Sequence, residues 1–312
     1  MTSVQTVTGL IAVQRLGVVD AHNHVWIAPD ERLPPAMPRL CDQSAIQAEL
    51  SDYRQAGGTA IVDCQPGGCG RDGRMLARLA RASGVYLVAC TGFHLRQYYP
   101  AHHWLWQASA EQAARLFVNE VRYGLEETTD TPHPVRAGFI KIACQARLEQ
   151  TSLGLLEAAA MASLQTGSPL MAHTERGLDA ERIVGRLTGW GVPASRLALA
   201  HMDKRPDRGL HRALADAGVL LIYDTFYRPK YDPDHNLLPL LEHMLGAGYE
   251  RRIAIGTDMA DASFWQRLGG RPGLTGLFST ILPRLQNIGL SSAVISRLTG
   301  GNAADWLAAS EA

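Results

Sequence analysis

The stretch Gly17-Val18-Val19-Asp20-Ala21-His22-Asn23-His24 joins a short apolar run to two closely spaced histidines. In a β-strand, residues two positions apart point to the same face, so His22 and His24 project together. Neutral imidazole is the commonest metal-binding side chain, and the pair therefore predicts a metal site. Histidine pairs also occur on protein surfaces without a metal, so the remainder of the chain has to support this interpretation.

Short apolar runs alternate with amphipathic or Ala/Leu-rich segments along the whole chain. The runs are mostly continuous, which is typical of parallel strands covered on both faces. The eight predicted strands are Gly17–His22, Thr59–Cys64, Val85–Gly92, Gly138–Ala143, Pro169–His173, Arg196–His201, Val219–Tyr223 and Arg252–Thr257. The clearest predicted helices are Gln43–Gln55, Asp72–Ala82, Glu111–Leu125, Leu153–Gln165, Leu178–Thr188 and Asp207–Ala217. This order predicts an α/β fold, a (β/α)8 TIM barrel, with an open doubly wound sheet as the alternative.

Composition limits the class of protein. The 312 residues are 46% hydrophobic and 19% charged, which suits one barrel domain over 1–312 with a small N-terminal appendage at 1–16. The formal net charge is zero, which argues against nucleic acid or an anionic membrane as the partner. Neither a signal peptide nor a membrane-spanning run is visible, and the five cysteines lack metal-finger spacing. We therefore expect reduced thiols and a cytoplasmic location.

Six polar residues fall at the predicted carboxyl ends of the strands, where barrel enzymes gather their chemistry. Any one of them has an ordinary structural explanation, such as a helix cap or a hydrogen-bonded core residue. Their joint placement at one level of the barrel predicts a metal site. The six are His22, His24, Lys141, His173, His201 and Asp258.

The types of ligand indicate which metal and which chemistry to expect. Imidazole and carboxylate favour Zn, with Mn or Co as alternatives. Six ligands are too many for one tetrahedral ion and suit two divalent ions that share a bridge. A neutral Lys141 amine could react with carbon dioxide and supply an anionic carbamate bridge. Bound metal lowers the pKa of water to about 7, which provides a hydroxide nucleophile whose proton Asp258 could accept.

With these residues in this order, the chain resembles the phosphotriesterase-like branch of the amidohydrolase superfamily. The resemblance rests on Val19–His24, Thr59–Asp63, Gly70–Asp72, Thr91–His94, Gly138–Lys141, Ala172–Glu175, Ala200–Asp203 and Gly256–Asp258, in this order. It implies that carbamylated Lys141 bridges two ions. His22, His24 and Asp258 would hold the more buried ion, and His173 and His201 the more exposed one. Enzymes of this branch hydrolyse esters, lactones and, in some cases, phosphotriesters.

The loops after the third and seventh strands suggest a substrate. Arg228, Lys230 and Tyr231 form a compact set of donors that suits a phosphate or carboxylate. This stretch resembles that of lactonases acting on phosphorylated sugar lactones, in which a bridging hydroxide would attack the carbonyl. Tyr98 could donate to the lactone ring oxygen or carbonyl oxygen, although Tyr98 and Tyr99 could equally pack the loop.

Other interpretations of these loops stay open. Arg228 and Lys230 could simply pair with Asp224, Asp232 or Asp234 in a solvated loop. Some lactonases of this type carry a basic residue around the strand-eight aspartate, where this chain has Thr257 and Asp261. The phosphate could then be held differently, or the substrate could lack one. The remaining histidines show no partner pattern and are expected to be structural or exposed. They are His94, His133, His211, His235 and His243.

Four further functions compete with the lactonase. The same two metals could serve a phosphotriesterase, a carboxylesterase or an amidase, and a barrel with a non-catalytic metal site is a further possibility. The aromatic insertion at 102–106 could line the pocket, pack the loop or form a dimer contact. The resemblance alone suggests a homodimer.

Overall fold

The computed structural model describes residues 2–31, 33–34 and 36–308. Eight parallel strands pair with their neighbours in chain order and form a nearly closed barrel. Each observed strand falls inside or within one residue of its prediction, and the barrel prediction is confirmed. The strands are β3 (Val19–Asn23), β4 (Ala60–Asp63), β5 (Tyr86–Gly92), β6 (Phe139–Ala143), β7 (Leu170–His173), β8 (Leu197–Ala200), β9 (Leu220–Tyr223) and β10 (Ile253–Ile255).

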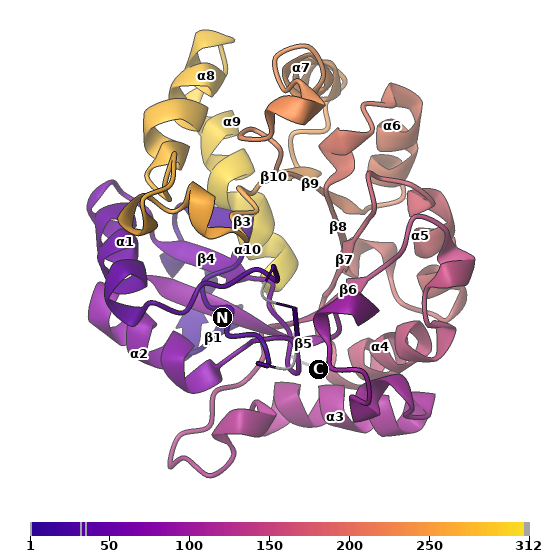
Figure 1. Cartoon of the computed structure of the whole chain (residues 1–312). Helices are drawn as coiled ribbons and strands as arrows, with labels where there is room; N and C mark the ends of the chain where they lie inside the picture. The colour runs from indigo at the N-terminus through magenta and orange to yellow at the C-terminus, as the bar shows by residue number, and fades with distance from the viewer. Residues whose placement is uncertain (1, 32, 35, 309–312) are drawn as a thin grey trace.

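Helices surround the strands as an outer ring (Figure 1). Several helices begin at a residue whose side chain accepts a backbone N–H of the first turn, as Asp42, Asp72 and Asp207 do. All six predicted helices are present in the structure. Their observed bounds are α1 (Gln43–Gln55), α2 (Gly73–Ser83), α3 (Ala110–Arg122), α4 (Leu153–Thr166), α5 (Ala180–Gly189) and α6 (Arg208–Asp216). Four more follow in the second half, namely α7 (Leu237–Gly246), α8 (Leu282–Asn287), α9 (Ser292–Ser296) and α10 (Asn302–Leu307).

The barrel closes where the segment after β10 meets β3. The backbone N–H groups of Thr257 and Asp258 donate to the carbonyl oxygen of His22, at 3.1 and 2.9 Å. Gly256 permits this approach, because a Cβ there would lie 2.8 Å from the Cβ of His22. The closure therefore brings Asp258 beside the first histidine.

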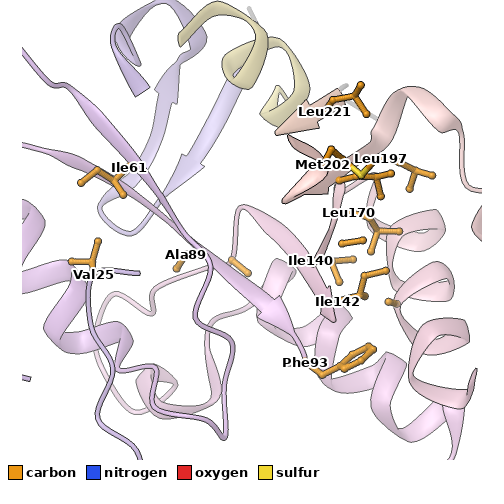
Figure 2. Packing of buried hydrophobic residues seen from close by; sticks show 14 of the residues in the cluster. Val25, Ile61, Ala89, Phe93, Ile140, Ile142, Leu170, Leu197, Met202 and Leu221 are labelled. Atoms are coloured by element: carbon orange, nitrogen blue, oxygen red, sulfur yellow. The ribbon is translucent and has the colours of Figure 1, made fainter. Parts of the chain in front are cut away.

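The buried apolar side chains form two layers that follow the alternation of the strands. Val62, Cys90 and Ala198 point into the barrel, whereas Ile61, Ala89 and Leu197 belong to the layer between strands and helices. Figure 2 shows part of this outer layer, with Ile140, Leu170 and Leu197 of neighbouring strands on the side where the helices lie. Because both faces of the strands are covered by apolar side chains, polar side chains are accommodated mainly at the strand ends.

The hairpin near the start of the chain and the helix α10 near its end both pack at the amino-terminal side of the barrel. The predicted appendage contains an antiparallel hairpin of β1 (Ser3–Thr6) and β2 (Gly9–Ala12). Trp306 of α10 packs against Phe139 at the start of β6, with ring centroids 5.7 Å apart. Within the described residues, no helix is long and apolar enough to cross a membrane.

Candidate metal centre and active site

His22 and His24 leave the end of β3 toward Asp258, as their spacing predicts. The Nε2 atoms of His22 and His24 lie 3.9 and 3.8 Å from Oδ1 of Asp258. One ligand atom from each of the three residues falls within 4.8 Å of the others, a spacing that could hold a metal ion. These donors fit the more buried ion of the predicted pair.

His173 and His201 end the neighbouring strands β7 and β8. Nε2 of His201 lies 3.0 Å from Nδ1 of His173, and the ring centroids of His201 and His22 are 4.9 Å apart. The structure therefore brings the four predicted histidines together, and three of them, His22, His24 and His201, lie within 3.9 Å of Asp258. In addition, Nε2 of His173 lies 2.9 Å from a carboxylate oxygen of Glu175.

Lys141 lies in the middle of β6 and is fully buried. Its Nζ lies 3.4 Å from Nε2 of His22 and 3.9 Å from Sδ of Met171. No carboxylate among the described residues forms an ion pair with this amine. A buried ammonium without an ionic partner is costly, so this position calls for a compensating group. Gly92 of β5 makes room here, because a Cβ at Gly92 would overlap the carbonyl oxygen of Lys141.

Asp224 is a central residue of the site that the sequence analysis did not place there. It follows β9, is fully buried, and accepts from Nδ1 of His22 at 2.7 Å and from Nδ1 of His201 at 2.8 Å. These bonds place a ring proton on Nδ1 of each histidine, so that each Nε2 is the nitrogen that could bind a metal. Burial disfavours its ionisation, but His201 and His22 hold the pKa of Asp224 well below its usual value. Its place at a strand end was the signal that could have identified it.

A second carboxylate lies behind Asp224. Asp203 accepts from the backbone N–H of Asp224 at 3.2 Å and of Thr225 at 2.8 Å, and also from the Thr225 hydroxyl. Burial, and then the charge of Asp224, raise the pKa of Asp203 to about 7. Asp203 therefore fixes the backbone from which Asp224 reaches the two histidines.

Two of the predicted ligands have a left-handed backbone. The φ angle is 65° at His201 and 48° at Asp258, in a backbone region that residues other than glycine rarely adopt. Such conformations persist where the surroundings impose them, and they concentrate at functional sites. The hydrogen bond from the His201 N–H to Asp224 Oδ2, at 3.2 Å, contributes to that restraint.

A cavity of about 210 Å³ opens over these residues. One wall is polar and is formed by the histidines and Asp258, with cationic side chains at its edge. Residues from the loop between β3 and α1 provide an apolar wall. The described lining residues are His24, Ile27, Pro29, Leu33, Met37, Pro38, Gln65, Cys69, His94, Tyr98, His173, His201, Lys204, Arg228, Asp258 and Ala260.

Of the three predicted phosphate donors, only Arg228 lines the cavity. Arg228 lines the cavity, but its Nη2 donates to the backbone oxygen of Asp258 at 2.5 Å and lies 3.2 Å from Oδ2. Its guanidinium also stacks 4.3 Å from the centre of the Phe264 ring. The alternative that Arg228 pairs with Asp224 is therefore wrong, because Asp224 lies buried beneath the histidines.

The other two predicted donors lie outside the lining of the cavity. Lys230 is exposed, and its Nζ lies 5.0 Å from the centre of the Tyr231 ring. Lys204, which the sequence analysis did not select, lines the cavity and lies 5.4 Å from the same ring. The Tyr231 ring thus has an ammonium group near it from each of two loops.

His94 and Tyr98 line the cavity from the loop after β5. His94, which was expected to be structural or exposed, is buried, and its ring centroid lies 5.4 Å from that of His173. Burial, and then the nearby His173 and Lys141, hold the pKa of His94 well below its usual value. His211, by contrast, is structural, since it is buried and bonded to the Tyr223 hydroxyl at 2.7 Å.

Known proteins share this fold and sequence pattern. Residues 2–307 match the Phosphotriesterase family, and the chain belongs to that family. A phospho-furanose lactonase of Mycoplasmopsis synoviae is 28% identical over 308 residues, which cover 93% of this chain and 87% of that protein. An N-acetyltaurine hydrolase of Mus musculus is 27% identical, with 97% of each chain covered.

Solved structures agree with the fold. An amidohydrolase from Mycoplasma synoviae has a TM-score of 0.91 at 27% identity, covering 99% of this chain and 93% of that one. A lactonase from Listeria monocytogenes has a TM-score of 0.90 at 23% identity, covering 99% of this chain and 100% of that one. The predicted family and the predicted class, a hydrolase of ester bonds, are confirmed.

Proposed function

We propose that the chain is a metal-dependent lactonase whose substrates are sugar lactones carrying an anionic group such as phosphate. The observation that carries this proposal is the convergence of four histidines, Asp258 and Lys141 beside a cavity that Lys204 also lines. Relatives named phospho-furanose lactonases support the same substrate class. The donor set suits two divalent ions, with Zn preferred and Mn or Co as alternatives.

The six residues divide into two ligand groups in this proposal. His22, His24 and Asp258 would hold one ion, and His173 and His201 the other. Carbamylated Lys141 would bridge them, which would remove the cost of its unpaired buried charge. Two such ions would polarise the ester carbonyl and acidify the attacking water. Asp258 would orient that water and pass a proton to the departing alkoxide.

The distribution of lysines supports recognition of an anion. The chain has only three lysines, namely Lys141, Lys204 and Lys230. Lys204 lines the cavity, and no described carboxylate forms an ion pair with it. Lys230 lies outside the lining of the cavity, although its ammonium group and that of Lys204 are both near the Tyr231 ring. An anionic group of the substrate would pair with the Lys204 ammonium and so position the lactone ring.

The substrate proposal is tested with metal-loaded protein and matched lactones with and without phosphate. Wild type is expected to hydrolyse the phosphorylated lactone with the higher kcat/KM. The Lys204→Met variant should raise KM for that substrate roughly 10- to 100-fold and change little for the unphosphorylated one. Equal effects on both lactones would remove Lys204 from anion recognition.

The competing hydrolase functions are tested in the same assay. Because one relative is named an N-acetyltaurine hydrolase, that amide is included, together with a carboxylic ester and a phosphotriester. Faster turnover of any of these than of every lactone would replace the proposed function. Retained turnover after complete metal removal would exclude the metal-dependent mechanism.

A further inference from the structure

We propose that His94 is a substrate-binding residue that donates a hydrogen bond from Nε2–H to the ester group of the bound lactone. The proposal deepens the lactonase function and rests on it. His94 belongs neither to the metal-ligand set proposed above nor to the cationic side of the cavity. Its assignment comes from the position of the ring, from the tautomer that its contacts impose and from the loop that holds it.

The position of His94 places it next to the reacting group. It follows β5 and lines the cavity at the same strand ends as the proposed ligands. Its ring centroid lies 5.4 Å from that of His173 and 6.3 Å from that of His24. An ester held at those ligands lies within reach of a donor on this ring.

A local hydrogen bond decides which nitrogen of His94 carries the proton. The backbone N–H of Leu95 donates to Nδ1 of His94 at 2.7 Å. A nitrogen that accepts a hydrogen bond carries no proton, so in the neutral ring the proton is on Nε2. Within the part of the chain that the structure describes, no acceptor lies within hydrogen-bond distance of Nε2. The N–H is therefore available to a molecule in the cavity.

The surrounding loop holds the ring in place. The Tyr99 hydroxyl accepts the backbone N–H of His94 at 2.9 Å, and the Tyr98 ring packs at 84° to the imidazole with centroids 4.6 Å apart. Tyr99 is buried, whereas Tyr98 lines the cavity. A donor fixed in this way needs little reorganisation as negative charge develops on an ester oxygen. His94 keeps its proton throughout, so the role is hydrogen bonding and not proton transfer.

The hydrogen-bonding role of His94 is tested with two substitutions, one that removes the N–H donor and one that keeps a donor. His94→Phe removes the N–H, and His94→Gln returns one at a similar reach. We expect His94→Phe to lower kcat/KM for the lactone roughly 10- to 100-fold, and His94→Gln to recover most of it, at unchanged metal content. The exposed His102 supplies matched controls, His102→Phe and His102→Gln, which should behave like wild type. A loss below about threefold in His94→Phe, or no recovery in His94→Gln, would overturn the proposal.

A substrate analogue identifies the accepting oxygen. The 2-deoxy lactone lacks the hydroxyl beside the carbonyl but keeps the ester. The penalty of His94→Phe should persist with this analogue. If the penalty disappears, the bond goes to the hydroxyl and the assignment to the ester is wrong.

Nitrogen NMR of histidine-labelled, zinc-loaded protein tests the tautomer without any turnover. His94 is assigned as the ring missing from the His94→Gln spectrum. Its Nδ1 is expected to be unprotonated and its Nε2 protonated. A proton on Nδ1 would refute the donor role even if the lactonase activity is real. Conversely, absence of lactone turnover by wild type would refute the proposed function and leave the tautomer result standing.

Discussion

The guanidinium of Arg228 is bound to Asp258, with Nη2 3.2 Å from Oδ2 and 2.5 Å from the backbone oxygen. This contact joins the loop after β9 to a proposed metal ligand from the segment after β10. Binding a phosphate, as expected for Arg228 from the sequence, requires guanidinium N–H groups that are not already hydrogen-bonded, whereas Nη2 is bonded to Asp258. Arg228 is therefore better placed to position Asp258 than to select the substrate.

Replacing Arg228 with methionine tests that assignment, because the variant keeps the stem and removes the charge. Burial disfavours ionisation of Asp258, but His201 and His22, and to a smaller extent Arg228, hold the pKa of its carboxyl below its usual value. Removing the Arg228 charge should therefore shift the acidic limb of the kcat–pH profile to higher pH. We expect kcat to fall by about tenfold for lactones with and without phosphate alike. A rise in KM confined to phosphorylated lactones would contradict the positioning role and restore phosphate recognition.

Lys141→Ala removes the proposed bridge. The variant should bind fewer than two equivalents of metal and lose lactonase activity, and short carboxylic acids should restore both in part. Metal analysis and kinetics measure this directly. Wild type in labelled bicarbonate should show a carbamate carbon signal that Lys141→Ala lacks. Lys230→Met is the control for metal content, and full activity of Lys141→Ala would exclude a bridging role.

Asp224→Asn should weaken metal binding. The amide offers only one acceptor, so either His22 or His201 loses the partner that holds its proton on Nδ1. We expect metal affinity to fall about 10- to 100-fold, measured by competition with a chelator. Asp232→Asn, on an exposed loop residue, should bind metal as wild type does. Unchanged affinity in Asp224→Asn would show that the two carboxylate–imidazole bonds do not tune the site.

The raised pKa of Asp203, about 7, predicts a pH dependence of stability. Folded protein keeps a proton that an unfolded aspartate, with a pKa of about 3.9, has lost. This contribution to the free energy of unfolding is complete below about pH 4 and is lost as the pH rises through about 7. Asp203→Asn should therefore lose less stability than wild type between pH 5 and pH 8 in urea unfolding. Equal losses in the two proteins would contradict the assignment.

Gly256→Ala tests the closure of the barrel. The added Cβ would lie 2.9 Å from the backbone nitrogen of His22, in a contact between two backbones that cannot relax freely. We expect a loss of about 2–4 kcal/mol in the free energy of unfolding. Gly185→Ala, in the middle of α5 with nothing within 4 Å, is the control and should be neutral or slightly stabilising. Equal stability of the two variants would show that the closure tolerates a Cβ.

The sequence by itself determined the barrel fold and the end of the barrel at which the site lies. Apolar runs of strand length alternate with capped helices, and a polar residue that ends such a run can only lie at the rim of the barrel. His22, His173, His201 and Asp258 were predictable for this reason. The order of the motifs along the chain was also sufficient to identify the family.

Only the tertiary structure decided which polar residues meet. Asp224 binds His22 across 202 positions of sequence, and Arg228 reaches Asp258 rather than the carboxylates beside it in its own loop. The direction of a loop side chain follows from barrel closure and local backbone bonds, which have no periodic pattern in the sequence. For the same reason the tautomer of His94 and the exposure of Lys204 became visible only in the folded chain.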